Sequence, residues 1–97
     1  MPLTLTSRER SGLKARAHHL KPIARVGQAG LSDAFIAEVD RALADHELIK
    51  VQVGLDDREE RNAAAMEICA RTSSAEVQRV GKVLVLWRPK PQAEEEA

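Results

Sequence analysis

The stretch Val77-Gln78-Arg79-Val80-Gly81-Lys82-Val83-Leu84-Val85-Leu86-Trp87-Arg88 decides the fold that this sequence predicts. Its second half, residues 83–87, is apolar at every position, which is typical of a strand that is covered on both faces of a sheet. Gly81 stands first in a two-residue loop, which suits the type II′ turn of a β-hairpin. The stretch therefore predicts two antiparallel strands, 77–80 and 83–88, in a sheet with other elements packed on both sides.

Helices and strands alternate upstream of this hairpin. Thr6 and Glu9 fit a capping box, so a first helix is expected from there to about Ala17. Ser32 is a good N-cap for a second helix, and Asp57 with the acids after it caps a third. The sequence thus predicts an α-β-α-β-α-β-β order and a four-stranded mixed sheet with three helices, an α+β fold with β-α-β crossovers. The expected strands before the hairpin are 23–26 and 47–53.

Length and composition bound the class of protein. The chain has 97 residues, of which 43% are hydrophobic and 31% charged, and this describes one globular domain. We expect that domain in residues 1–90, with a frayed acidic tail in 91–97. No run approaches 18 apolar residues, so no membrane partner is expected. The single Cys69 excludes an intrachain disulfide and indicates a reducing, cytoplasmic setting.

The net charge of zero hides a strong asymmetry along the chain. Residues 1–26 carry a net charge of +5, residues 31–76 carry −6, and residues 77–92 carry +4 before the three acids of the tail. A neutral total alone would argue against a nucleic-acid partner, but the segments indicate a bipolar surface. We expect residues 1–26 and 77–92 to form one basic face, with the acidic helices facing away. The alternative is a solvated surface with no partner.

The motif Gly27-Gln28-Ala29-Gly30 lies between a predicted strand and a predicted helix. Its glycines allow a sharp turn and close approach of a ligand, and free amides at a helix start attract phosphate oxygens. The motif is neither a Walker A loop nor a dinucleotide fingerprint, and a purely structural turn also explains it. Lys21 and Arg25 just upstream favour phosphate binding, whereas Asp33 in the first helical turn opposes it mildly.

Metal binding and catalysis find little support in the residues. His18 and His19 are adjacent, so they cannot easily reach one ion, and no spacing with His46 or Cys69 completes a zinc site. No nucleophile has a recognisable active-site setting, so neither an enzyme, a cofactor nor a small-molecule substrate is expected. With one Phe, one Trp and no Tyr, the chain lacks an aromatic platform for bases. Any RNA binding would depend on phosphates and helix shape.

Four blocks of the chain resemble the CRM domain (chloroplast RNA splicing and ribosome maturation) in its bacterial, single-domain, YhbY-like form. The resemblance covers residues 6–88, and its blocks are 13–22, 26–31, 46–53 and 77–88. It implies a fold similar to the C-terminal domain of a bacterial translation initiation factor. It also implies binding of structured RNA, expected to be ribosomal RNA, and association with precursors of the large ribosomal subunit. The chain departs from the family in its uncharged Gln28-Ala29 and in Trp87, where Tyr is common.

The resulting hypothesis is a small, non-enzymatic RNA-binding protein that acts in assembly of the large ribosomal subunit. The rival class is a protein–protein adaptor that uses the acidic segment 38–60, and an enzyme comes third. By matching position the resemblance assigns the glycine loop and Lys21, Lys50, Lys82 and Arg88 to RNA. The complete predicted RNA-binding set is Gly27, Gln28, Ala29, Gly30, Arg8, Lys14, Lys21, Arg25, Lys50, Lys82 and Arg88.

Overall fold

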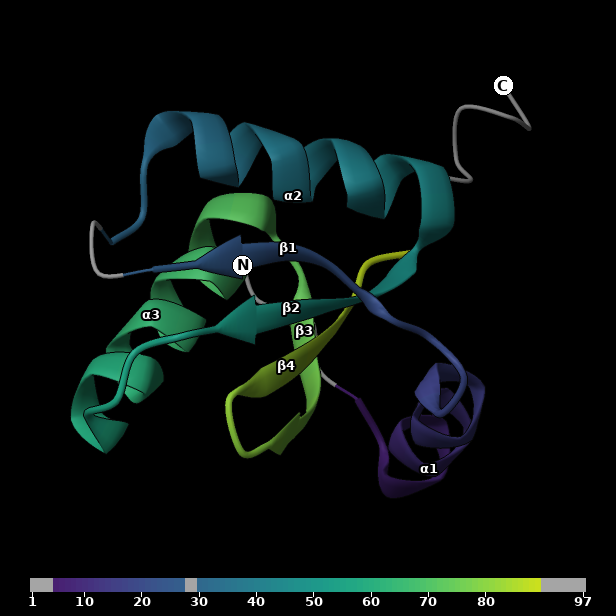
Figure 1. Ribbon diagram of the computed structural model, residues 1–97. Helices are drawn as coiled ribbons and strands as arrows, with labels where there is room; N and C mark the ends of the chain where they lie inside the picture. The colour runs from purple at the N-terminus through teal and green to yellow at the C-terminus, as the bar shows by residue number, and fades with distance from the viewer. Residues whose placement is uncertain (1–4, 28–29, 90–97) are drawn as a thin grey trace.

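The apolar strand β4 (Val83–Trp87) lies inside a four-stranded sheet of order β1-β2-β4-β3 (Figure 1). The structure is a computed structural model that describes residues 5–27 and 30–89. β4 runs antiparallel to β2 (Leu48–Val53) and to β3 (Ala75–Val80), and β1 (Pro22–Val26) pairs in parallel with β2 at the sheet edge. The predicted order of elements, the mixed sheet and the hairpin are confirmed. Gly81, with a φ of 58°, turns the hairpin.

The three helices begin where local sequence predicts. They are α1 (Ser7–Ala17), α2 (Asp33–His46) and α3 (Arg58–Thr72), and their N-caps are Thr6, Ser32 and Asp57. Each capping side chain accepts a hydrogen bond from an amide of the first turn, which satisfies a donor that the helix itself leaves unpaired. Within the described residues no helix combines the length and the apolar character needed to cross a membrane.

The larger core lies between the sheet and the helices α2 and α3. Leu84 and Leu86 of β4 face this side, and they pack with Ile68 of α3 and Leu43 of α2. In α3, Ile68 is fully buried, whereas the neighbouring Cys69 is only half-buried. Burial of these aliphatic side chains supplies most of the drive for folding. The other fully or nearly buried members are Val26, Phe35, Ile36, Val39, Ile49, Val51, Val53, Ala64 and Ala65.

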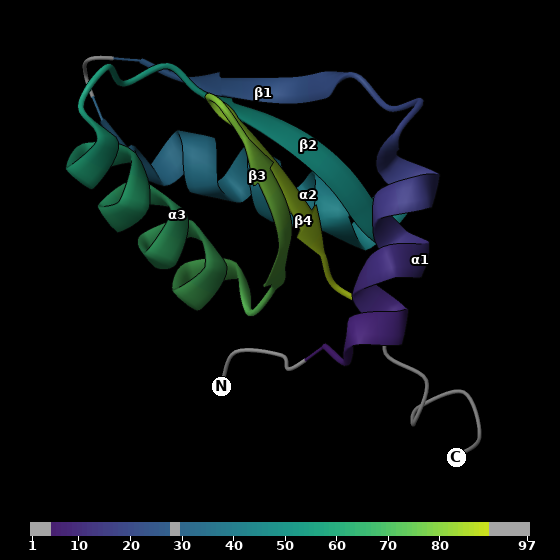
Figure 2. The ribbon, with the colours of Figure 1, turned by 90° about the horizontal axis from the view of Figure 1, so that it is seen from below.

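Helix α1 covers the opposite face of the sheet, and it covers only part of it (Figure 2). Leu13 and Ala17 pack on Val77 and Val85, which gives the central strand its second apolar layer. The Arg10 guanidinium donates to the main-chain carbonyls of Glu76 and Val77, at 2.7 and 2.8 Å, and so fixes the helix to β3. On this face the part of the sheet beyond α1 is left uncovered. In Figure 2 it is the part of the strands seen between the ribbons of α1 and α3.

Arg88 joins the last strand to both helices of the larger core. Its Nη1 donates to Asp40 Oδ1 of α2 at 2.6 Å and to the carbonyl of Thr72, at the end of α3, at 2.8 Å. Its amide donates to the carbonyl of Glu47 at 2.9 Å. The side chain is only 22% exposed, so these hydrogen bonds are partly shielded from water. Arg88 is therefore part of the framework.

We expect Arg88→Gln to lower the free energy of unfolding by about 1.5–3 kcal/mol, because it removes charge-assisted hydrogen bonds from a shielded site. Arg71→Gln is the matched control, since Arg71 pairs with Asp33, whose side chain is 100% exposed, and surface pairs contribute little. Urea unfolding of both variants measures the difference. Equal stability of the two variants would contradict the framework role of Arg88.

Candidate functional site

The uncovered part of the sheet presents two rows of side chains on the same side as α1. Strand register places Gln78 of β3 and Lys50 of β2 in one row, on either side of Val85 of β4, which α1 buries. The next row holds Val80, Val83, Gln52 and Arg25, across all four strands. Residues directly opposite each other in a sheet point to the same face, so these side chains form one surface. We call Arg25, Lys50, Gln52, Gln78, Val80 and Val83 the open sheet face. Lys50 and Gln52 both project from it.

A cleft follows the line where α1 meets the open sheet face. Lys14 stands on the α1 side of this cleft and Lys50 on the sheet side, and the cleft has a volume of about 340 Å³. In the part of the chain that the structure describes, neither lysine forms an ion pair. Two predicted RNA-binding cations, 36 residues apart in sequence, therefore share one site. We call it the α1 cleft, and its lining residues are Lys14, Ala17, His18, Lys50, Gln78, Val80, Val83 and Val85.

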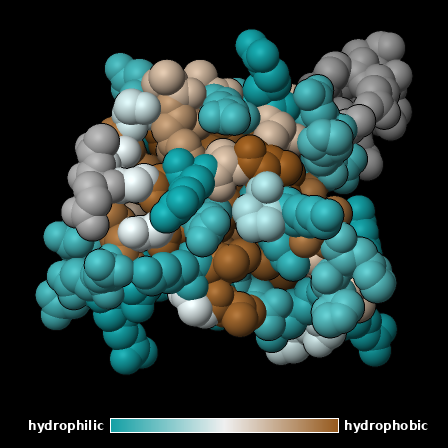
Figure 3. Space-filling view, in the orientation of Figure 1, coloured by the Kyte–Doolittle hydropathy of each residue, from teal (hydrophilic) through white to brown (hydrophobic). Residues whose placement is uncertain are grey.

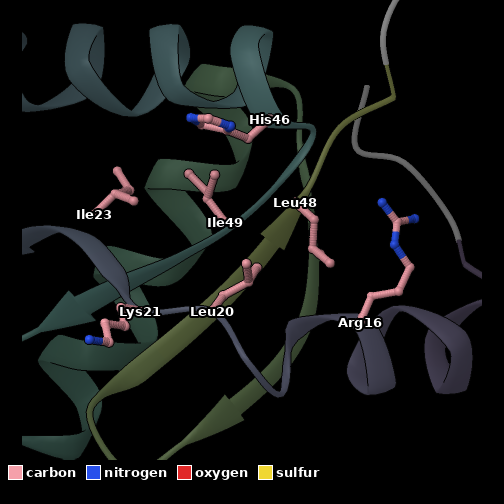
Figure 4. Close-up of a pocket in the computed structure, with 7 residues that line it drawn as sticks. All are labelled: Arg16, Leu20, Lys21, Ile23, His46, Leu48 and Ile49. Atoms are coloured by element: carbon pink, nitrogen blue, oxygen red, sulfur yellow. The ribbon is translucent and has the colours of Figure 1, made fainter.

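A second hollow lies where the start of β1 meets the end of α2 (Figure 4). Its volume is about 490 Å³, and aliphatic side chains such as Leu20 and Ile23 line it between Lys21 and Arg16. Figure 4 shows these two cations on opposite sides of the hollow. The predicted site residue Lys21 thus lies beside α1, but outside the α1 cleft. Arg16, which the predicted set lacks, joins it there.

The glycine loop follows β1 at the far end of the open sheet face. The Gly30 amide donates to the carbonyl of Gly27 at 3.0 Å, so a hydrogen bond closes the turn. Gly30 has a φ of 85°, a left-handed conformation that favours glycine. Because its amide is already engaged, Gly30 serves the shape of the loop, whereas Gly27 is exposed. Gln28 and Ala29 lie outside the described residues.

Gly54 holds the two loops at this end together, and the sequence-based set missed it. Its amide donates to the carbonyl of Val26 at 2.8 Å, while a Cβ on Gly54 would lie 2.9 Å from that same oxygen. The Arg25 side chain passes over the same glycine, with its Nε 3.2 Å from the position of that Cβ. Gly54 is therefore required by a close approach of β1 and β2. The signal was a glycine directly after a predicted strand, which marks such approaches.

The basic residues of the hairpin are already paired with acids, which corrects part of the charge prediction. Arg79 pairs with Glu76 and hydrogen-bonds Asn62 of α3, and Arg88 pairs with Asp40. The expectation that residues 77–92 join one basic face is wrong for these two arginines. Both side chains are directed toward α2 and α3, because their partners Asp40 and Asn62 belong to those helices. A count of charge by segment does not include such contacts between distant parts of the chain.

Lys82 lies at the hairpin turn, at the same end as the glycine loop. Its Nζ is 2.7 Å from Asp56 Oδ1, and this hydrogen bond, with the charge of Lys82, lowers the pKa of the Asp56 carboxyl. Its carbonyl accepts from the Val53 amide, which ties the turn to β2. A phosphate that reaches Lys82 must therefore compete with a carboxylate.

The predicted site residue Arg8 lies apart from these groups. It is exposed in the first turn of α1 and lines neither the α1 cleft nor the hollow beside Lys21.

Acidic side chains lie close to the glycine loop on its α3 side. Glu60 and Glu67 line a hollow with Gly30 and Leu31. A ligand anion is therefore favoured only on the other side of the loop, toward the open sheet face. In residues 5–27 and 30–89, no cluster of His, Cys, Asp and Glu is arranged to hold a metal ion. Burial raises the pKa of the Cys69 thiol, which makes it a poorer nucleophile.

With this geometry in place, comparison with known proteins identifies the family. A model of the CRS1/YhbY (CRM) domain matches residues 5–88. The chain belongs to the CRM domain family. It is 42% identical over 89 residues to a probable RNA-binding protein of Pseudomonas aeruginosa, covering 92% of this chain and 86% of that one. It is also 42% identical over 90 residues to an RNA-binding protein of Haemophilus influenzae, covering 93% and 91%.

A solved structure of similar fold extends the comparison of this CRM domain to three dimensions. The solution structure of a Staphylococcus aureus protein, described as an RNA-binding candidate, superposes with a TM-score of 0.80 at 29% identity. The match covers 95% of this chain and 96% of the other. The predicted fold and the resemblance to the family are both confirmed.

We expect Gly54→Ala to lower the free energy of unfolding by about 1–3 kcal/mol, because the new Cβ forces β1 and β2 apart. Gly12→Ala is the matched control. Gly12 lies inside α1 with open space at its Cβ, so alanine there should stabilise the protein by about 0.5–1 kcal/mol. Thermal unfolding of the two variants gives opposite shifts if the close approach matters. A Gly54→Ala protein as stable as wild type would show that it does not.

Proposed function

We propose that this CRM domain binds structured RNA through the open sheet face, the α1 cleft and the glycine loop, and that it acts without catalysis. The observation that carries the proposal is the convergence of Lys14, Lys50 and Arg25 on one side of the molecule. None of the three has an ion-pair partner among the described residues. The names of the relatives point to the same ligand.

RNA would bind along the strands of the open sheet face. Lys14 and Lys50 neutralise phosphates at the α1 cleft, and Arg25 neutralises another closer to the glycine loop. Lys50 lies three residues before Val53, which pairs with Val26 at the start of the loop. At about 3.3 Å per residue, cleft and loop are roughly 10 Å apart along the strand. One RNA strand can therefore contact both.

The groups on this surface suit binding rather than chemistry. Lysine and arginine side chains bind anions, and the amides of Gln52 and Gln78 donate and accept hydrogen bonds. On the open sheet face, these side chains do not form a recognisable pairing of a nucleophile with a general base. We therefore propose a protein that binds folded RNA reversibly, with no substrate turnover.

We further propose that the RNA is ribosomal and that the protein acts in the cytoplasm on precursors of the large ribosomal subunit. The support is the resemblance of the four sequence blocks to the YhbY-like form of the family. The adaptor hypothesis for segment 38–60 is weakened by the structure, because Asp40 and Asp56 in that segment already pair with Arg88 and Lys82. Fewer acids are then available to bind a basic partner.

We expect the double variant Lys14→Gln plus Lys50→Gln to bind structured ribosomal RNA about tenfold more weakly, because two phosphate contacts are lost. The slope of log affinity against log salt should fall by about 1–2 for the same reason. Arg41→Gln is the matched control, an exposed cation on α2 at the opposite side of the sheet. Filter binding between low and moderate salt measures both quantities. Loss of the same size in Arg41→Gln would mean that binding is not confined to this face.

The ribosomal role is tested in cells of the source organism. At low salt the tagged protein should sediment with large-subunit precursors, because phosphate contacts persist there, and the Lys14→Gln plus Lys50→Gln variant should shift to the top of the gradient. RNA sequencing of the bound fraction identifies the ligand. Enrichment of other RNAs, with none of the large-subunit RNA, would refute the ribosomal role and leave RNA binding intact.

A further inference from the structure

Val80 is an apolar side chain in an unexpected place. It is 58% exposed, although it lies on a strand of the sheet and beside the basic α1 cleft. Val83, its partner across the hairpin, is also incompletely buried. The cleft thus sets an apolar floor beside cations. The ligand that fits such a floor combines an apolar surface with negative charge.

We propose that the α1 cleft holds the base of one unpaired nucleotide against Val80 and Val83, while Lys14 and Lys50 hold its phosphate. This inference rests on the proposed RNA binding and adds a specificity to it: the protein distinguishes unpaired from paired RNA. Figure 3 shows apolar residues at the surface over the strands, with hydrophilic residues around them.

The charges that line the cleft select an anionic occupant. Lys14 and Lys50 contribute positive charge, His18 adds a further nitrogen-bearing ring, and no acidic side chain of residues 5–27 or 30–89 lines the cleft. An acid would repel a phosphate at this distance, so its absence from the lining favours a nucleotide. The volume of about 340 Å³ lies at the lower end of the range for small-ligand sites, which fits one nucleotide.

The polar groups beside the floor suit the edge of a base. Gln78 lies in the row next to Val80, with Val85 and Lys50 across the sheet. Its amide both donates and accepts, so it can pair with a base edge that is exposed only when the base is not in a duplex. The faces of a paired base are covered by its stacked neighbours, and they cannot reach Val80. The cleft therefore favours loops and bulges.

The floor is aliphatic, so its effect is on selectivity more than on overall affinity. Stacking on a large aromatic ring is the stronger contact, and among the described residues no Phe, Tyr or Trp lines this cleft, where His18 is the one ring. The lysines bind the phosphates of paired and unpaired RNA alike. Removal of the apolar floor should consequently lower the preference for unpaired RNA and leave binding of duplex RNA and the salt slope unchanged.

The test compares an RNA hairpin that has an unpaired loop with a fully paired duplex of the same length. We expect wild type to bind the hairpin about five- to tenfold more tightly, which is the size of effect of one apolar base contact. Val80→Ser should reduce this ratio to less than about twofold, and Gln78→Ala should reduce it in part. Met66→Ser, a change at an exposed apolar residue of α3, is the matched control and should leave the ratio unchanged.

A spectroscopic readout covers the case in which a variant folds poorly. In wild-type protein, a uridine tetranucleotide should shift the methyl resonances of Val80 and Val83 through the ring current of the base, and it should leave the Met66 methyl unshifted.

Failure of the base site and failure of the proposed RNA binding give different results. If wild type binds neither RNA, the proposed function is wrong. If wild type binds both RNAs but Val80→Ser keeps the ratio, or the two valine methyls do not shift, RNA binding stands and the base site is refuted. The exposed valine then belongs to a protein-docking surface.

Discussion

Burial of β4 on both faces is the constraint on which the rest of the structure depends. Its alternate side chains point to opposite sides, so two separate apolar layers must form. Helices α2 and α3 together supply one layer, with Leu84 and Leu86 at its centre. Helix α1 alone supplies the other, and at 11 residues it is about 16 Å long. A single short helix cannot cover four strands, and the candidate site is the part that it leaves open.

Local signals predicted the elements well because each acts over a few residues. The caps Thr6, Ser32 and Asp57 and the hairpin glycine Gly81 are of this kind, and all four occupy the expected positions. The order of strands was not accessible in the same way. Insertion of β4 between β2 and β3 is decided by which faces must be covered, a property of the whole sheet.

The candidate site was predictable only in part. Lys14, Lys50 and Arg25 were in the predicted set and do lie on one side of the sheet, whereas Arg88 and Lys82 are engaged with acids. Those partners are 48 and 26 residues distant in sequence, so a count of charge by segment cannot find them. Val80 was missed for another reason: in a hairpin pattern an exposed valine looks the same as a buried one. Only the limited reach of α1 makes it accessible.

Main-chain hydrogen bonds at the glycine-loop end determine which parts of this fold can change in sequence. The bonds from Gly54 to Val26 and from Val53 to Lys82 join main-chain atoms only. Main-chain bonds persist when side chains change, so the spacing between the loop, the β2 end and the hairpin turn is inherited with the backbone. The surface chemistry can then drift independently of the scaffold. Exposed side chains on this corner of the molecule can therefore be exchanged by design without the need for a new fold.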